Sequence, residues 1–221
     1  MEHVETLSQT QVSTLATNRL IRNTYTLLAM TLTFSAIMAG VAAYFEIRPF
    51  GLGITMLGYF GLLFLTTKFR NSGMGIVCVF ALTGFMGATL GPILSYYLAT
   101  SHGTTLVMQA LGATAFIFFA LSAYTLVSRK DFSFMGGFLF VGVLVAFLAG
   151  LAAIFFNMPT LSLAVSAAFV LIASGLILFE TSAIIHGGET NYIMATVSLY
   201  VSIFNLFVSL LHLLNVFSGD D

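Results

Sequence analysis

The chain has 221 residues, of which 59% are hydrophobic and only 7% are charged, and its formal net charge at pH 7 is −1. A soluble domain usually carries about 25% charged residues because its surface faces water, so this composition excludes an ordinary soluble domain and indicates a protein whose solvent is the lipid bilayer. The near-zero charge also argues against nucleic-acid binding, which needs a basic surface.

The N-terminal segment is unlike the rest of the chain. The first 20 residues are polar and rich in Ser, Thr and Gln. They lack the apolar core and cleavage site of a secretory signal peptide, so we expect no processing there. Because such a segment has little apolar surface to bury, we predict a disordered polar tail over residues 1–23.

Seven apolar segments follow, each close to the roughly 20 residues that a helix needs to cross the hydrocarbon core. They cover residues 24–45, 50–67, 73–98, 105–127, 132–156, 160–184 and 192–217. They are too long and too continuous for barrel strands, which run for about ten residues with alternating polarity. We therefore predict an all-α polytopic protein with a seven-helix transmembrane domain over residues 24–217 and a short C-terminal segment, 218–221, on the far side.

Positive charges predict the orientation of this bundle. All but one lie before the first segment or after the second or fourth, at Arg19, Arg22, Lys68, Arg70, Arg129 and Lys130. Only Arg48 falls on the other side. The positive-inside rule then places the N-terminus in the cytosol and the C-terminus in the periplasm.

The third segment contains an interruption at Gly91-Pro92, near its outer end. Proline cannot donate a backbone hydrogen bond, so we expect a kink or an early helix end there, and the pair is a hinge candidate. The other glycines within the segments are interpreted as positions where helices pack closely in lipid.

The last two segments carry the polar groups that a membrane helix rarely contains. One carboxylate, Glu180, lies inside the sixth segment, and a polar stripe on one helical face of the seventh consists of Ser198, Ser202, Asn205, Ser209 and His212. A carboxylate in hydrocarbon costs on the order of a few kcal/mol, so it usually faces a partner, a cavity or a functional path.

Depth along the two helices predicts that these groups can meet if the helices pack as neighbours. Glu180 precedes the expected turn at residues 186–188 by about six residues, which is roughly 9 Å of helix, and Ser198 follows Asn191 by a similar length. We expect Glu180 to take up a proton near physiological pH because burial disfavours the charged form. The ion or proton site candidates are Glu180, Ser198, Ser202 and Asn205. A neutral glutamic acid that only supports helix packing remains an alternative.

Other polar residues near this hairpin are weaker site candidates: Thr181, His186, Glu189, Ser209 and His212. His186 and Glu189 offer two types of metal ligand three residues apart, but no second pair accompanies them, so we expect no metal site. No cofactor is expected, and calcium or protons would bind only if the hairpin transports ions.

Enzyme motifs are missing from the sequence. There is no His-Glu-x-x-His zinc motif and no Gly-x-Ser-x-Gly nucleophile motif. Both lysines lie at segment ends, where they could not bind retinal, and the histidines are too scattered to ligate haem. We therefore expect that the protein is not an enzyme.

Several short motifs resemble those of a known family. They lie at residues 22–25, 90–94, 122–124, 129–133, 136–137, 179–181, 185–192, 199–200 and 205–207. Together they resemble the Bax inhibitor-1 family of seven-span proteins, most closely its bacterial YccA branch, over essentially the whole chain. The resemblance implies six helices arranged around a central last helix, which agrees with the polar stripe of the seventh segment.

The resemblance implies two different functions. Some members look like pH-sensitive calcium leak channels in which an acid in the sixth span pairs with an acid in the seventh. Glu180 matches the first acid, but the second position is Ser202 here. One carboxylate cannot share a proton with a serine as two carboxylates do, and it is a poorer calcium site. This difference weakens the channel interpretation.

The YccA branch instead implies association with the membrane-anchored AAA protease FtsH, as a substrate and modulator of membrane-protein quality control. The N-terminal tail would offer the ATPase a cytosolic handle. Our first hypothesis is therefore a bacterial inner-membrane regulator of FtsH. The alternatives are a proton or calcium leak centred on Glu180, and a protein whose polar hairpin serves packing alone.

Overall fold

The computed structural model describes the backbone of residues 2–219 and the side chains of residues 15–219. In order, its helices are α1 Glu2–Tyr44, α2 Leu52–Phe69, α3 Gly73–Leu98, α4 Gly103–Ser128, the short 3-10 helix η1 Ser133–Met135, α5 Gly136–Phe155, α6 Pro159–His186 and α7 Tyr192–Phe217. Within the described part of the chain, seven helices are long and apolar enough to span a membrane, and no residue lies in a strand. The prediction of an all-α seven-span protein is confirmed.

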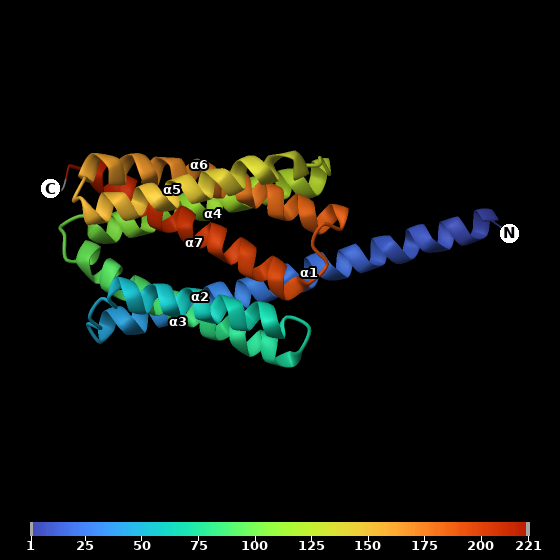
Figure 1. The fold of residues 1–221 in the computed structure, drawn as a ribbon, viewed down its shortest axis with the longest axis horizontal. Coiled ribbons are helices and arrows are strands. Elements are labelled where there is room, and N and C mark those ends of the chain that lie inside the picture. The colour runs from blue at the N-terminus through green and yellow to red at the C-terminus, as the bar shows by residue number, and fades with distance from the viewer. Residues whose placement is uncertain (1, 220–221) are drawn as a thin grey trace.

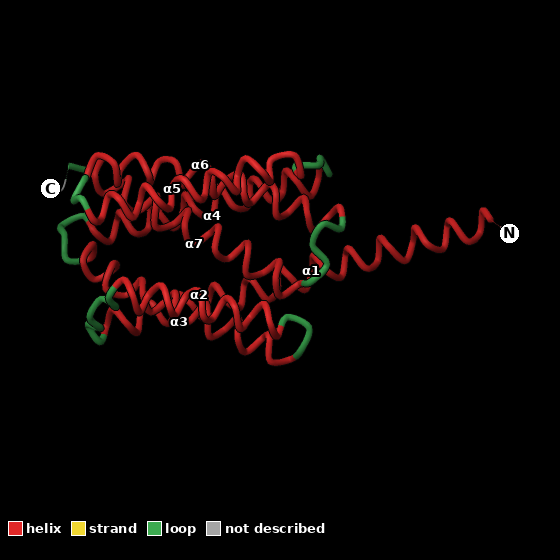
Figure 2. The backbone as a smooth tube through the Cα atoms, in the orientation of Figure 1, coloured by secondary structure: helices red, strands yellow, loops and turns green. Residues whose placement is uncertain are grey.

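The helices form two groups on either side of α7 (Figure 1). Helices α1, α2 and α3 pack together in one group, and α4, α5 and α6 in the other. Helix α7 crosses between the groups and contacts members of both, while the loops gather at the two ends of the bundle (Figure 2). Half of the residues in an apolar 18-residue stretch of α7 are buried, compared with 6% in the corresponding stretch of α2. The expected central position of the last helix is therefore confirmed.

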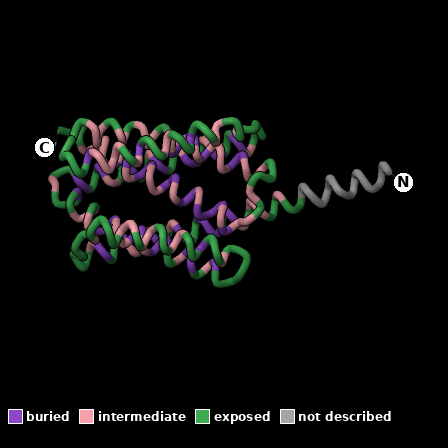
Figure 3. The backbone as a smooth tube through the Cα atoms, in the orientation of Figure 1, coloured by how far each residue is buried: buried purple, intermediate pink, exposed green. Residues whose placement is uncertain are grey.

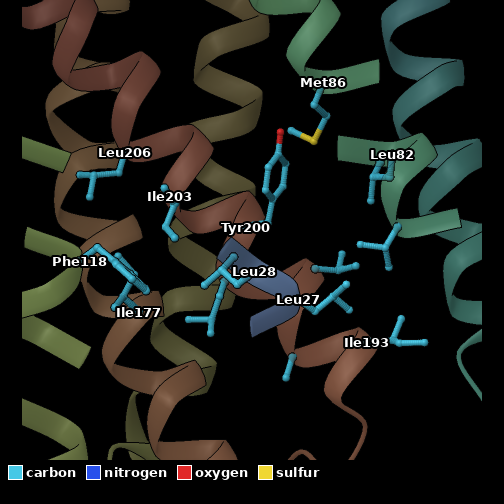
Figure 4. Packing of buried hydrophobic residues seen from close by; sticks show 14 of the residues in the cluster. Leu27, Leu28, Leu82, Met86, Phe118, Ile177, Ile193, Tyr200, Ile203 and Leu206 are labelled. Carbon is cyan, nitrogen blue, oxygen red and sulfur yellow. The ribbon is translucent and has the colours of Figure 1, made fainter. Parts of the chain in front are cut away.

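The core of the protein follows the length of α7 (Figure 3). Leu199, Tyr200 and Leu206 of α7 are almost completely buried, together with Leu28 of α1 and Leu82 of α3. Figure 4 shows the ring of Tyr200 among these side chains. Lipid tails are as apolar as leucine, so close packing and hydrogen bonds, rather than escape from water, hold such helices together.

One hydrogen-bonded group in this core joins three helices. The Tyr200 hydroxyl donates to the backbone carbonyl of Thr83 in α3 at 3.2 Å. Its oxygen lies 2.6 Å from the Ser35 hydroxyl of α1, which must be the donor because Tyr200 has only one hydroxyl hydrogen. The buried tyrosine thereby links α7 to α1 and α3.

Helix α3 continues through Gly91-Pro92 and ends at Leu98. Of the two expected outcomes, the early helix end is wrong and the kink stays a prediction. Pro92 removes a single backbone donor, and the surrounding packing holds the helix in place. A side chain at Gly91 would overlap Ala42, and one at Gly87 would overlap the backbone of Ser35, which shows how closely α1 approaches. The role of residues 91 and 92 as a hinge stays a prediction.

The disordered tail over residues 1–23 stays a prediction, and the structure gives this segment as helix from Glu2. Helix α1 begins at Glu2, runs without a break into the first membrane span, and projects from the bundle at its N-terminal end (Figure 1). No glycine or proline occurs before Gly40, so nothing in the sequence stops the helix from extending beyond the membrane. Met1 and residues 220–221 lie outside the described part of the chain.

Candidate functional site

Glu180 of α6 and Ser202 of α7 face each other. The Ser202 hydroxyl lies 3.1 Å from Oε1 and 3.1 Å from Oε2 of the Glu180 carboxyl. It carries one hydrogen, so the two oxygens share it as a bifurcated bond. Ser202 is buried and Glu180 is partly buried. The expected meeting of the sixth and seventh helices therefore occurs at this pair.

A cavity of about 390 Å³ leads to Glu180 from the α6–α7 loop. Its lining comes from α6, α7, their connecting loop and the α4–α5 loop: Asp131, Ser133, Phe179, Glu180, Ser182, Ala183, His186, Gly188, Glu189, Ala195 and Ser198. His186 and Gly188 are exposed, whereas Ser182 is buried. The cavity thus extends from the loop surface to a carboxyl within the bundle.

The four main site candidates separate into two groups. Glu180 and Ser198 line the cavity, and Ser202 bonds to Glu180. Asn205 donates from Nδ2 to the carbonyl of Val201 at 2.9 Å, within its own helix, and is not among the cavity-lining residues. Of the polar stripe on α7, Ser198 and Ser202 therefore lie beside Glu180, whereas Asn205 lies outside the cavity lining.

The weaker candidates on the helices lie apart from Glu180. The Thr181 hydroxyl is 3.4 Å from the Tyr25 hydroxyl and therefore faces α1. Ser209 is buried farther along α7, and His212 Nδ1 lies 2.8 Å from the Ser166 hydroxyl of α6. None of these three residues lines the cavity.

His186 and Glu189 line the cavity and also order its loops. His186 Nε2 lies 3.1 Å from the backbone oxygen of Arg129. Glu189 Oε1 accepts from the amides of Thr190 at 2.8 Å and Asn191 at 2.7 Å. Among residues with described side chains, no cluster of three or more His, Cys, Asp or Glu could hold a metal ion.

Sequence analysis missed three lining residues with polar side chains, namely Asp131, Ser133 and Ser182. Asp131 Oδ1 accepts a hydrogen bond from the Ser133 amide at 2.8 Å. Aspartate side chains often bond to the backbone amide two residues later in a turn, so this contact could have been predicted from the sequence. The Ser133 hydrogen bonds, with a smaller effect from nearby His186, hold the pKa of Asp131 below its usual range. Ser182 lies one turn before His186, a spacing that places both side chains on one helical face.

The asparagine at the start of α7 connects the α6–α7 hairpin to a third loop. Asn191 Oδ1 accepts from the amides of Ile193 and Met194 and so caps α7. Its Nδ2 donates to the Arg70 carbonyl at 2.9 Å and to Asn71 Oδ1 at 2.8 Å. The loop beside the cavity is thus fixed to the α2–α3 turn.

The arrangement supports proton exchange at one carboxyl more directly than it supports binding of a metal ion. Glu180 lines the cavity, and the Ser202 hydroxyl can bond to either protonation state of that carboxyl. Calcium takes six to eight oxygen ligands, often from several carboxylates. Glu180 has a serine, rather than a second acid, across from it.

Comparisons with known proteins match the whole bundle. A family model described as an inhibitor of apoptosis-promoting Bax1 covers residues 17–219. The chain is 52% identical over 220 residues to the modulator of FtsH protease YccA of Escherichia coli K12, and to the inner membrane protein YccA of Escherichia coli O6:H1, with full coverage of each chain. An uncharacterized protein of Pseudomonas aeruginosa is 53% identical over 201 residues, which are 91% of this chain and 90% of that protein.

Proposed function

Because the chain belongs to the Bax inhibitor-1 family of seven-span membrane proteins, we propose that it binds and modulates an FtsH-type membrane-anchored protease in the quality control of membrane proteins. The observation that carries this proposal is 52% identity, over the full length of both chains, with a protein named as a modulator of FtsH protease. A second relative, named as an inner membrane protein, supports placement in the bacterial inner membrane.

In this proposal the N-terminus lies in the cytosol. The start of the first membrane span, the α2–α3 turn and the α4–α5 loop share one end of the bundle (Figure 2). That end carries Arg19, Arg22, Lys68, Arg70, Arg129 and Lys130, whereas Arg48 lies at the other end. The positive-inside rule supports a cytosolic location for the first end and a periplasmic location for the C-terminus.

The N-terminal part of α1 is the proposed contact with the protease. It precedes the apolar stretch Leu15–Tyr44 and projects from the bundle (Figure 1). A single helix of about 12–15 residues is only marginally stable in water, so an ATPase can unwind it at small cost. The packed bundle behind this segment would resist extraction, and the protein would then occupy the protease without being degraded quickly.

Deletion of residues 2–14 tests this contact. We expect loss of protease co-purification from bacterial membranes, with an unchanged thermal unfolding temperature of the purified bundle. Deletion of residues 219–221, at the opposite end, is the matched control and should leave co-purification intact. If the variant lacking residues 2–14 still co-purifies with the protease, the N-terminal contact is rejected. If the full-length chain does not co-purify with the protease, the proposed function itself is rejected.

A second candidate function is a proton or calcium leak, which the cavity leading to Glu180 favours. Liposomes that contain the protein and a calcium or pH indicator test it directly. A leak predicts flux that depends on pH and is changed by Glu180→Gln. Ser166→Ala, which changes the hydroxyl bonded to His212 away from the cavity, is the control. Absence of flux between about pH 5 and pH 8 would exclude this function.

A further inference from the structure

The α4–α5 loop carries two cations at a boundary of the membrane. Arg129 and Lys130 lie between two stretches that are apolar enough to span the bilayer, Gly103–Ser128 and Ser133–Phe155. Both side chains are exposed. Because the spans on either side fill the hydrocarbon core, the loop and its charges lie at the depth of the lipid headgroups.

The backbone of this loop is fixed to α6. The Phe132 amide donates to Ser182 Oγ at 2.9 Å, and the Ser182 hydroxyl donates to the Lys130 carbonyl at 3.4 Å. His186 Nε2 lies 3.1 Å from the carbonyl oxygen of Arg129, which can only accept a hydrogen bond. These contacts use none of the charged groups of the loop. A ligand of those groups would meet a loop that is already ordered, so binding would cost little conformational entropy.

Arg129 has a backbone conformation that favours glycine. Its φ of 50° and ψ of 28° lie in the left-handed region, and its amide donates to the Thr125 carbonyl at the end of α4. Glycine adopts this conformation without the steric cost that a side chain adds, and it is the usual residue at such a helix end. The end of the helix therefore does not account for an arginine, and the guanidinium group remains to be explained.

A row of aromatic rings extends from Lys130 along the surface. Lys130 Nζ lies 5.6 Å from the centre of the Tyr124 ring, a cation–π contact. The Tyr124 ring centre lies 6.3 Å from that of Phe132, which in turn lies 6.5 Å from that of Phe134. Phe134 is 78% exposed, so its ring is open to lipid tails. We call these three rings the aromatic row.

The one carboxylate of the loop belongs to the other side of it. Asp131 Oδ1 accepts from the Ser133 amide at 2.8 Å, and both residues line the Glu180 cavity, whereas no member of the aromatic row does so. The surface beside the row therefore presents the cations. Positive groups next to exposed rings match a ligand with a negative head and hydrocarbon chains.

We propose that Arg129, Lys130 and the aromatic row bind an anionic phospholipid, with its phosphate at the two cations and an acyl chain along Phe134. Guanidinium groups bind phosphate oxygens in pairs, and a headgroup without a cation of its own leaves the attraction of both side chains unopposed. This site goes beyond the proposed function because its ligand is a lipid and it needs no protease.

Native mass spectrometry of the full-length protein in neutral detergent micelles tests the site. Phosphatidylglycerol is titrated, and phosphatidylcholine with the same acyl chains is the comparison. We expect phosphatidylglycerol to bind at least about tenfold more tightly, the size expected for two surface cations. Combining Arg129→Gly with Lys130→Gln should abolish this preference. The unfolding temperature should not fall, because glycine keeps the backbone bonds of position 129 and suits its left-handed conformation.

Three controls separate a site from general attraction. Combining Lys68→Gln with Arg70→Gln removes two charges from the α2–α3 turn, at the same end of the bundle (Figure 2), where Lys68 lies over the ring of its neighbour Phe69. This variant should keep the preference. Phe134→Ala should weaken the binding of phosphatidylglycerol, because it removes the contact with the chain. Glycerol phosphate, which has the charge without the chains, should not displace the lipid.

Equal affinity of the native chain for the two lipids would overturn the proposal, as would a preference that survives the changes at Arg129 and Lys130. Equal loss of preference in the Lys68 and Arg70 variant would show diffuse attraction and overturn it as well. Loss of protease co-purification in the Arg129 and Lys130 variant, with the lipid preference kept, would assign the loop to a protein partner instead. If that variant unfolds, Lys130→Gln alone replaces it and should lower the preference about fivefold.

Discussion

The Ser202 hydroxyl is equidistant from both carboxyl oxygens of Glu180, at 3.1 Å each, and so joins α7 to the C-terminal part of α6. Ser202→Ala should lower the free energy of unfolding by about 1–3 kcal/mol, because it leaves a partly buried carboxyl without this donor. Thermal unfolding in detergent measures the effect. Ser198→Ala, at the same cavity, is the control and should have a smaller effect.

Tyr200→Phe keeps the ring in the core but removes the hydroxyl that joins α7 to α1 and α3. We expect a loss of about 1–3 kcal/mol, since the Thr83 carbonyl and the Ser35 hydroxyl both lose their partner. Tyr96→Phe, the same chemical change at a side chain that is 70% exposed, is the control and should have little effect. Equal unfolding temperatures for the two variants would contradict the role of this hydroxyl.

Gly87→Ala places a methyl group against the Ser35 backbone, so α1 and α3 would have to separate. We expect destabilisation by about 1–3 kcal/mol, the usual effect of overpacking. At Gly61 of α2 a Cβ meets nothing within 4 Å. Gly61→Ala should therefore be neutral or slightly stabilising, and a thermal shift assay on both variants compares the two sites.

Asn191→Ala removes both the N-cap of α7 and the bonds to the α2–α3 turn. Loss of such a cap costs about 1 kcal/mol, and loss of the bonds to the turn adds to it. Asn191→Asp keeps an oxygen that can cap the helix but loses the Nδ2 donor to Arg70. Its unfolding temperature should therefore lie between those of the native chain and Asn191→Ala.

Asp131 makes the α4–α5 loop sensitive to acid. Hydrogen bonds from Ser133 lower the pKa of this carboxyl in the folded chain, so its contribution to stability is present above the usual aspartate pKa and is lost as pH falls through the lowered value. Hydrogen exchange of residues 131–135 should therefore accelerate, after intrinsic correction, between about pH 5 and pH 3. Asp131→Asn should exchange without this acid-dependent change.

Residue periodicity predicted the parts of the site that lie within helices. The spacing of Ser198 and Ser202 placed them on one face of α7, and their depth brought Ser202 to Glu180. The same spacing included Asn205, whose side chain bonds instead to its own backbone, a choice that spacing cannot distinguish. Ser182 escaped notice because its contacts come from residues about 50 positions away.

The outcome at Gly91-Pro92 also depends on contacts between segments that are distant in the sequence. Local rules predicted a kink or an early helix end there, and close packing of α3 against α1 holds the helix through Pro92. The disordered tail over residues 1–23 stays a prediction. Helix number and the central seventh helix depend on apolar length and polar periodicity, and both were predicted correctly.

The helix at the centre of the bundle is also the last to be synthesised. Until residues 192–217 leave the ribosome, the first six helices have no partner for the inner faces that α7 covers, and Glu180 waits in the bilayer without Ser202. The contacts that join the two groups of helices through α7 can therefore form only after α7 has been made. A nascent chain cut short before Tyr192 would be inserted in the membrane, but the faces of its six helices that α7 covers would have no partner.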